Sequence, residues 1–120
     1  MKKVFYLFII ASFVLFSCSC RNSAPIVTIT SPSTNNSFYL GSDIEFKCDS
    51  EDEEDIVLNE NNIVWTSNKD GEIGEGSEIT KNDLSVNEHK ITVTVTDSKD
   101  HIATDDITIH VLENDFVFNV

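Results

Sequence analysis

The chain has 120 residues, of which 21 are acidic and 8 are Lys or Arg, so its formal net charge at pH 7 is −13. Such an acidic surface repels nucleic acid and anionic lipid headgroups, which argues against any partner that needs a basic footprint. The length suits one small domain, and a domain of this size rarely encloses a catalytic cleft.

The N-terminus has the layout of an export signal. Lys2 and Lys3 form a positive start, and an uncharged, mostly apolar run follows at residues 4–16. This run is short for a membrane-spanning helix, which needs about 20 residues. We therefore expect residues 1–17 to be a signal peptide; an uncleaved anchor helix is the alternative.

The sequence Leu15-Phe16-Ser17-Cys18 resembles the lipobox of bacterial lipoproteins. The resemblance implies a diacylglycerol on the Cys18 sulfur and cleavage before that residue, although an ordinary secretory signal with a coincidental cysteine is the alternative. Cys20 is the less favoured acceptor, because Ser17 would then occupy the aliphatic position. Ser19 resembles the residue that directs lipoproteins to the outer membrane. We expect a lipid-anchored protein of the bacterial cell envelope, at the outer rather than the inner membrane, facing the periplasm or the surface.

Cleavage would leave six basic and 21 acidic residues, a formal charge of −15. Residues 18–24 are small and polar, which suits a flexible lipidated tether, and Pro25 marks the start of a domain. We expect that domain to cover residues 25–113 and a tail to cover residues 114–120.

Short segments with period-2 alternation and many β-branched residues follow Pro25, separated by clusters of Ser, Asn, Asp and Gly. Strands are predicted at 26–30, 43–48, 62–67, 89–96 and 102–111, with a weaker region around Ile79, Leu84 and Val86. The turn at 97–100 joins the last two strands into a hairpin. The pattern predicts an all-β fold, a single antiparallel sandwich of about seven strands and of immunoglobulin-like size.

Three segments, PIVTITSP, IVWTSNKDGEIGEG and LSVNEHKITVTVTDSKDHIATDDITIHV, resemble PKD-like and related bacterial immunoglobulin-like repeats over residues 25–112. The resemblance implies that Trp65 fills the core. Asn87 and Asp100 stand where these repeats commonly have glycine, and both residue types tolerate the left-handed conformation. The WDFGDG motif of PKD domains is absent.

A buried core is expected from seven residues: Phe46, Cys48, Trp65, His89, Ile91, Val93 and Val95. His89 stands where immunoglobulin-like sandwiches often have the tyrosine of a corner, and its imidazole could make the same hydrogen bond to the backbone. Cys48 is interpreted as a buried thiol outside any disulfide.

The acidic run at 49–55 is the sharpest local concentration of ligands for a hard cation. If calcium binds, we expect Asp49, Glu51, Asp52 and Asp55 to hold it, with Asp97 or Asp100 as further ligands. Glu54 replaces the glycine that an EF-hand loop requires. A solvated acidic loop is the favoured alternative, and no other cofactor is predicted.

Catalysis is not predicted. His101 and His110 alternate with inward-facing residues and are expected to face solvent, and neither lies in a motif that supplies a nucleophile or a metal. The chain also has no glycine-rich phosphate loop and no nucleophile elbow.

Two aromatic groups, Phe38-Tyr39 and the tail residues 116–118, could contact a glycan or a protein; Phe38 and Tyr39 are more simply read as covering one end of the sandwich. Taken together, the sequence predicts a monomeric, non-catalytic binding or spacer module for protein or glycan. The alternatives are a structural or truncated remnant of a multi-repeat surface protein and an accessory domain of a secreted hydrolase.

Overall fold

The computed structural model describes residues 23–53 and 59–115. The predicted signal peptide, Cys18, Asp55 and the tail from Phe116 onward lie outside the described residues. Within the described ranges, no helix is long and apolar enough to cross a membrane. The elements there are β1 (Ile26–Ser31), β2 (Asn36–Tyr39), β3 (Ile44–Glu51), the 3-10 turn η2 (Glu60–Asn62), β4 (Ile63–Ser67), β5 (Gly71–Glu75), β6 (Glu78–Lys81), β7 (Asn87–Thr96) and β8 (Ile102–Leu112).

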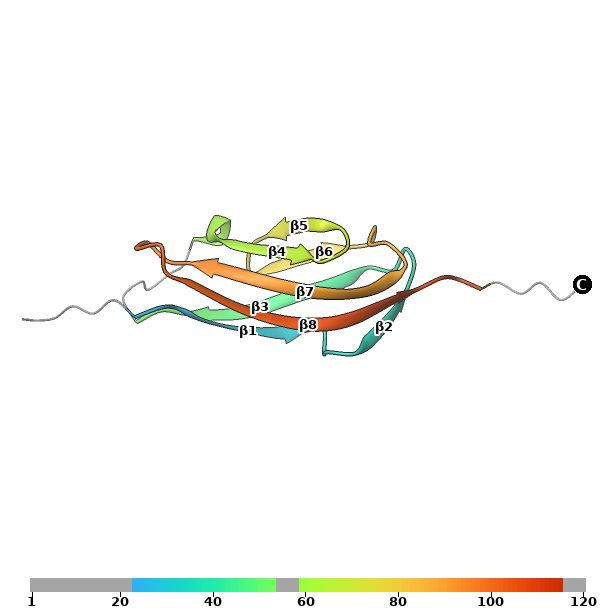
Figure 1. The fold of residues 1–120 in the computed structure, drawn as a ribbon, viewed down its shortest axis with the longest axis horizontal. Coiled ribbons are helices and arrows are strands. Elements are labelled where there is room, and N and C mark those ends of the chain that lie inside the picture. The colour runs from blue at the N-terminus through green and yellow to red at the C-terminus, as the bar shows by residue number, and fades with distance from the viewer. Residues whose placement is uncertain (1–22, 54–58, 116–120) are drawn as a thin grey trace, which may run out of the picture.

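The strands form two layers that face each other (Figure 1). One sheet has the order β1-β3-β6 and the other has the order β2-β8-β7-β4-β5. β1 begins at one end of the sandwich, and β8 leaves at the opposite end (Figure 1). The predicted all-β sandwich is therefore present, with eight strands in the part of the chain that the structure describes.

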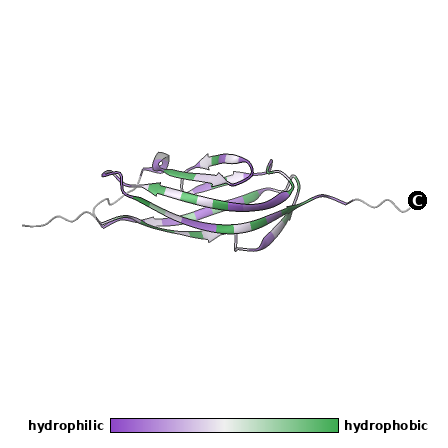
Figure 2. Cartoon of the chain, viewed as in Figure 1, coloured by the Kyte–Doolittle hydropathy of each residue, from purple (hydrophilic) through white to green (hydrophobic). Residues whose placement is uncertain are grey.

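Alternation along the strands builds the core. In β7 the side chains of His89, Ile91, Val93 and Val95 are buried, whereas the residues between them reach solvent. The same alternation is visible as changing hydropathy along the long strands (Figure 2). β-Branched side chains suit such half-buried pleated surfaces, which is why the threonines of β7 occupy its outer face.

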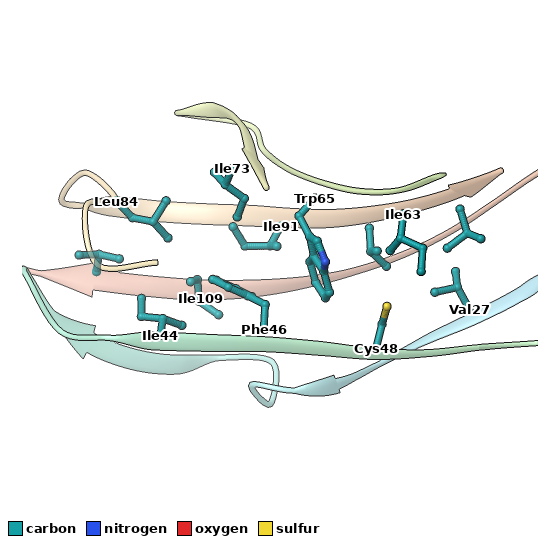
Figure 3. Close-up of a cluster of buried hydrophobic side chains, with 13 residues drawn as sticks. Val27, Ile44, Phe46, Cys48, Ile63, Trp65, Ile73, Leu84, Ile91 and Ile109 are labelled. Carbon is teal, nitrogen blue, oxygen red and sulfur yellow. The ribbon is translucent and has the colours of Figure 1, made fainter. Parts of the chain in front are cut away.

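The core lies between the two sheets (Figure 3). Its buried apolar residues are Val27, Ile44, Phe46, Cys48, Ile63, Trp65, Ile73, Leu84, Ile91, Val93, Val95, Ile109 and Val111. The rings of Phe46 and Trp65 pack at a centroid distance of 5.5 Å and an interplanar angle of 47°. The indole Nε1–H of Trp65 donates to the carbonyl of Gly76 at 2.8 Å, so this buried polar atom has a partner.

Three local features differ from the sequence prediction. β2 and β5 include residues from the clusters of Ser, Asn and Gly that were predicted to separate strands, and β2 pairs with β8 in parallel rather than antiparallel fashion. The weaker region contributes only β6, after which Leu84 is buried from a loop and Val86 is exposed. Tyr39 does not cover the end of the sandwich, because the residue is 59% exposed, whereas the neighbouring Phe38 packs on the core.

Candidate functional site

A buried polar cluster lies where β7 begins. The alternation of β7 turns His89 inward, and its ring is fully buried. Its Nε2 lies 2.7 Å from the carbonyl oxygen of Ser85, four residues earlier in the chain. This is the hydrogen bond to the backbone that was expected of a corner residue at this position. The other ring nitrogen, Nδ1, lies 2.8 Å from Oγ of Ser67, at the end of β4.

The hydrogen-bond partners of His89 define which of its ring nitrogens donates. Ser67 Oγ accepts the backbone N–H groups of Lys69 at 3.1 Å and of Asp70 at 3.2 Å. Its own proton is therefore available for Nδ1, while Nε2 must carry the proton that it donates to the Ser85 carbonyl. The hydrogen-bond network thus places a ring proton on Nε2, where it faces the Ser85 carbonyl.

Asp70 closes the cluster from the turn between β4 and β5. Its carboxylate accepts the backbone N–H of Ser85 at 2.8 Å and the Ser85 hydroxyl at 2.7 Å. Desolvation alone would raise the pKa of Asp70, but the two hydrogen bonds from Ser85, together with the positive charge of Lys81, hold the pKa below its ordinary value. Ser85 therefore ties the loop before β7 to both His89 and Asp70.

Ser67, His89 and Asp70 are the residue types of a hydrolytic triad, but their geometry does not support nucleophilic catalysis. Ser67 and Asp70 both face Nδ1, with Asp70 Oδ2 at 3.9 Å, whereas a triad places the serine and the acid on opposite ring nitrogens. Nε2 is engaged by a backbone carbonyl, and Ser67 Oγ is buried and already accepts two N–H groups. The cluster therefore holds three chain segments together.

A second buried polar group lies where β7 ends. The Asp97 side chain is buried, and its Oδ1 accepts the backbone N–H groups of Lys99 at 2.7 Å and of His101 at 2.8 Å. Its Oδ2 lies 3.0 Å from Nδ1 of His101. Asp100 adopts a φ of 68° in this turn. These contacts shape the β7–β8 hairpin and engage both oxygens that a calcium ion would need from Asp97.

The residues predicted for calcium are only partly brought together. Asp49 and Glu51 alternate with the inward-facing Cys48 and Ser50, so they share the outer face of the β1-β3-β6 sheet. Asp52 follows the end of β3. Within residues 23–53 and 59–115, no group of three or more His, Cys, Asp or Glu side chains is placed to hold a metal ion. The calcium site stays a prediction, since Asp55 lies outside the described residues.

Cys48 is a free thiol on the inner face of β3. Burial raises its pKa to about 11, and the nearby carboxylates of Glu60 and Asp49 add to the shift. A thiol that stays protonated at neutral pH is a poor nucleophile. Cys48 thus serves as a small apolar core residue.

An open hollow of about 570 Å³ lies where β8 leaves the sandwich, lined by Tyr39, Leu112, Glu113, Asn114 and Asp115. Of these five residues, the sequence points only to Tyr39 as a possible contact residue. Their approach depends on the parallel pairing of β2 with β8, in which Tyr39 lies opposite Leu112. No local pattern signals a contact between segments more than 70 residues apart in the chain.

No known family profile matches the sequence, and no match was found among curated proteins. Among solved structures, the fold is similar to the Clostridium thermocellum CbhA fibronectin(III)-like modules, with a TM-score of 0.61 and 14% sequence identity over 76% of this chain and 99% of that chain. At this identity the similarity establishes the fold. The described part of the chain is an immunoglobulin-like β-sandwich of the kind found in fibronectin(III)-like modules.

Proposed function

We propose that this protein is a lipid-anchored component of the bacterial cell envelope whose immunoglobulin-like domain is a non-catalytic module that binds, or spaces, a protein or a glycan. The anchor is the diacylglycerol expected on Cys18, which lies shortly before the first described residue, Ser23. The finer assignments, to PKD-like repeats and to the outer membrane, rest on sequence resemblance.

The observation that carries this proposal is where the first strand begins and where the last strand ends. β1 starts at one end of the sandwich, and β8 leaves at the opposite end (Figure 1). A lipid on Cys18 would therefore hold the end at which β1 starts near the membrane and direct the other end away from it. That is the arrangement that a spacer or a presented binding surface needs.

Two further observations support a non-catalytic role. The cluster at His89 has the residue types that most resemble catalytic machinery, but His89 and Ser67 are buried. Both ring nitrogens of His89 are engaged in structural hydrogen bonds. The acidic surface favours cations, basic proteins or neutral glycans as partners over nucleic acid or anionic lipid.

The test is the intact mass of the membrane-extracted protein, with Cys18→Ala as the comparison. We expect a mature chain that starts at Cys18 and carries added acyl mass, and we expect the variant to lose both the acyl mass and the membrane association. Cys20→Ala is the matched control and should leave the lipidated mass unchanged apart from the substitution. An unlipidated chain cleaved elsewhere would contradict the anchored module.

A further inference from the structure

We propose that the hollow at the end of β8 binds a neutral sugar unit of a glycan, with the ring of Tyr39 as its stacking platform. The proposal deepens the proposed function, because it names the ligand class and the surface that the anchored domain would present. It is carried by an exposed aromatic ring, a hollow of suitable size and a set of polar side chains around it.

The aromatic platform is fixed by the backbone. Tyr39 ends β2, where it lies opposite Leu112 of β8 in parallel register. The following turn is held by a hydrogen bond from the Ser42 N–H to the Tyr39 carbonyl at 2.9 Å, with Gly41 at a φ of 87°. Tyr39 is 59% exposed, and because a tyrosine has only two side-chain torsions to fix, holding its ring against a ligand costs little conformational freedom.

The wall of the hollow is also held in place. The N–H of Leu40 donates to the carbonyl of Leu112 at 2.8 Å, and the side-chain amide of Asn114 donates to the carbonyl of Leu40 at 3.0 Å. These two bonds keep the segment beyond β8 beside the Tyr39 turn. The hollow is thus built by two chain segments that hydrogen bonds connect.

The lining matches the chemistry of a sugar. One face of a sugar ring presents C–H groups that can stack on a tyrosine ring, and its edges present hydroxyl groups that donate hydrogen bonds. Tyr39 and Leu112 supply the apolar surface, and the carboxylates of Glu113 and Asp115 supply strong acceptors. The same carboxylates repel an anionic ligand.

The size of the hollow favours a sugar over a folded protein partner. Its volume of about 570 Å³ lies within the range typical of small-molecule sites, roughly 300–1,000 Å³. A stable protein interface instead buries about 1,200–2,000 Å² over a broad surface. The hollow is lined by residues at and beyond the end of β8. That strand ends at the opposite end of the sandwich from the start of β1 (Figure 1), so anchoring through Cys18 would leave the hollow accessible.

Saturation-transfer NMR on the full lipoprotein in perdeuterated detergent tests the proposal. The probes are cellohexaose, xylohexaose, mannohexaose and chitohexaose. At least one should receive saturation, and Tyr39→Ala should weaken its binding by about tenfold. Tyr39→Phe keeps the ring and should change the Kd by less than about twofold, because stacking does not need the hydroxyl. Ile102→Ala alters an equally exposed apolar residue at the other end of β8 and should have no effect.

Absence of saturation transfer to all four sugars would overturn the sugar site, as would binding that Tyr39→Ala leaves unchanged while the variant stays folded. Intact mass on the same preparation reports lipidation independently. A lipidated protein that binds no sugar would refute this inference alone, whereas an unlipidated protein that binds sugar would refute only the anchor.

Discussion

A buried polar side chain lies at each end of β7, and the two side chains differ in where their hydrogen-bond partners come from. At the start, His89 bonds to residues from two other segments, Ser67 at the end of β4 and Ser85 in the loop after β6. At the other end, the bonds that Asp97 makes to Lys99 and His101 stay within four residues. The first site connects distant parts of the fold, and the second shapes one hairpin.

This difference has an energetic consequence. Breaking a cluster that joins three segments removes contacts on which the packing of the whole sandwich depends, so the loss should spread through the fold. Breaking a local turn frees only its own residues, whose N–H groups can reach water once the hairpin loosens. Long-range and local burial of polar groups should therefore be distinguishable by experiment.

The largest effect is expected for His89→Ala. The substitution leaves a cavity in the core and removes partners from the Ser85 carbonyl and the Ser67 hydroxyl, so the free energy of unfolding should fall by about 3 kcal/mol. Urea denaturation followed by Trp65 fluorescence measures it. His110→Ala is the matched control, since His110 is about one-third exposed and the carboxylate beside it, Glu88, belongs to a surface residue. Equal losses in both variants would show that the cluster does not connect the fold as argued.

Asp97→Ala should have the next largest effect, about 2 kcal/mol, because the hairpin loses the carboxylate that accepts its turn N–H groups. Hydrogen exchange should speed up at residues 97–102, while amides in β3 and β4 keep their relative order of protection. Asp106→Ala, which removes an exposed carboxylate of β8, is the control and should change stability little. If hydrogen exchange in β4 became faster than the loss of global stability explains, Asp97 would stabilise more than its own hairpin.

The better-predicted parts of the fold are those with strong local patterns. The β7–β8 hairpin follows from alternation with outward threonines, and the same alternation places Phe46 in the core. Trp65 is also in the core, as the resemblance to bacterial immunoglobulin-like repeats implies. β5 was missed because its glycines resemble a turn. Gly74 lies so close to Ile79 that a Cβ there would approach the isoleucine side chain to 2.8 Å, so this glycine permits close packing of β5 on β6.

The candidate sites were predictable only in part, because their geometry depends on contacts between distant segments. The resemblance to the tyrosine corner of immunoglobulin-like sandwiches implies a bond from His89 to nearby backbone, yet nothing near His89 in the sequence points to Ser67, 22 residues away. The partner of Asp105 is equally unpredictable from the sequence. Its carboxylate, on β8, accepts the N–H of Ile29 on β1, in the other sheet, at 2.8 Å. The residue types can be read from the sequence, but the pairings require the fold.

The smallest effect concerns the acid that closes the His89 cluster, and it tests whether Asp70 stabilises the folded state as an ion. Because its pKa is lower in the folded chain than the ordinary value of 3.8, ionised Asp70 contributes stability above that value, and the contribution is lost as the pH falls through the lowered pKa. Asp70→Asn should therefore flatten the fall of Tm below about pH 4 while lowering Tm at neutral pH by only about 2 °C, since the Asp70 side chain stays 24% exposed and solvent screens its charge. Thermal melts between pH 2 and 7 measure both, with Asp106→Asn as the matched control. If the Tm of the Asp70→Asn variant fell at low pH as much as that of the unaltered protein, the hydrogen bonds from Ser85 would not depend on the charge of Asp70. His89 alone would then stabilise this corner of the fold.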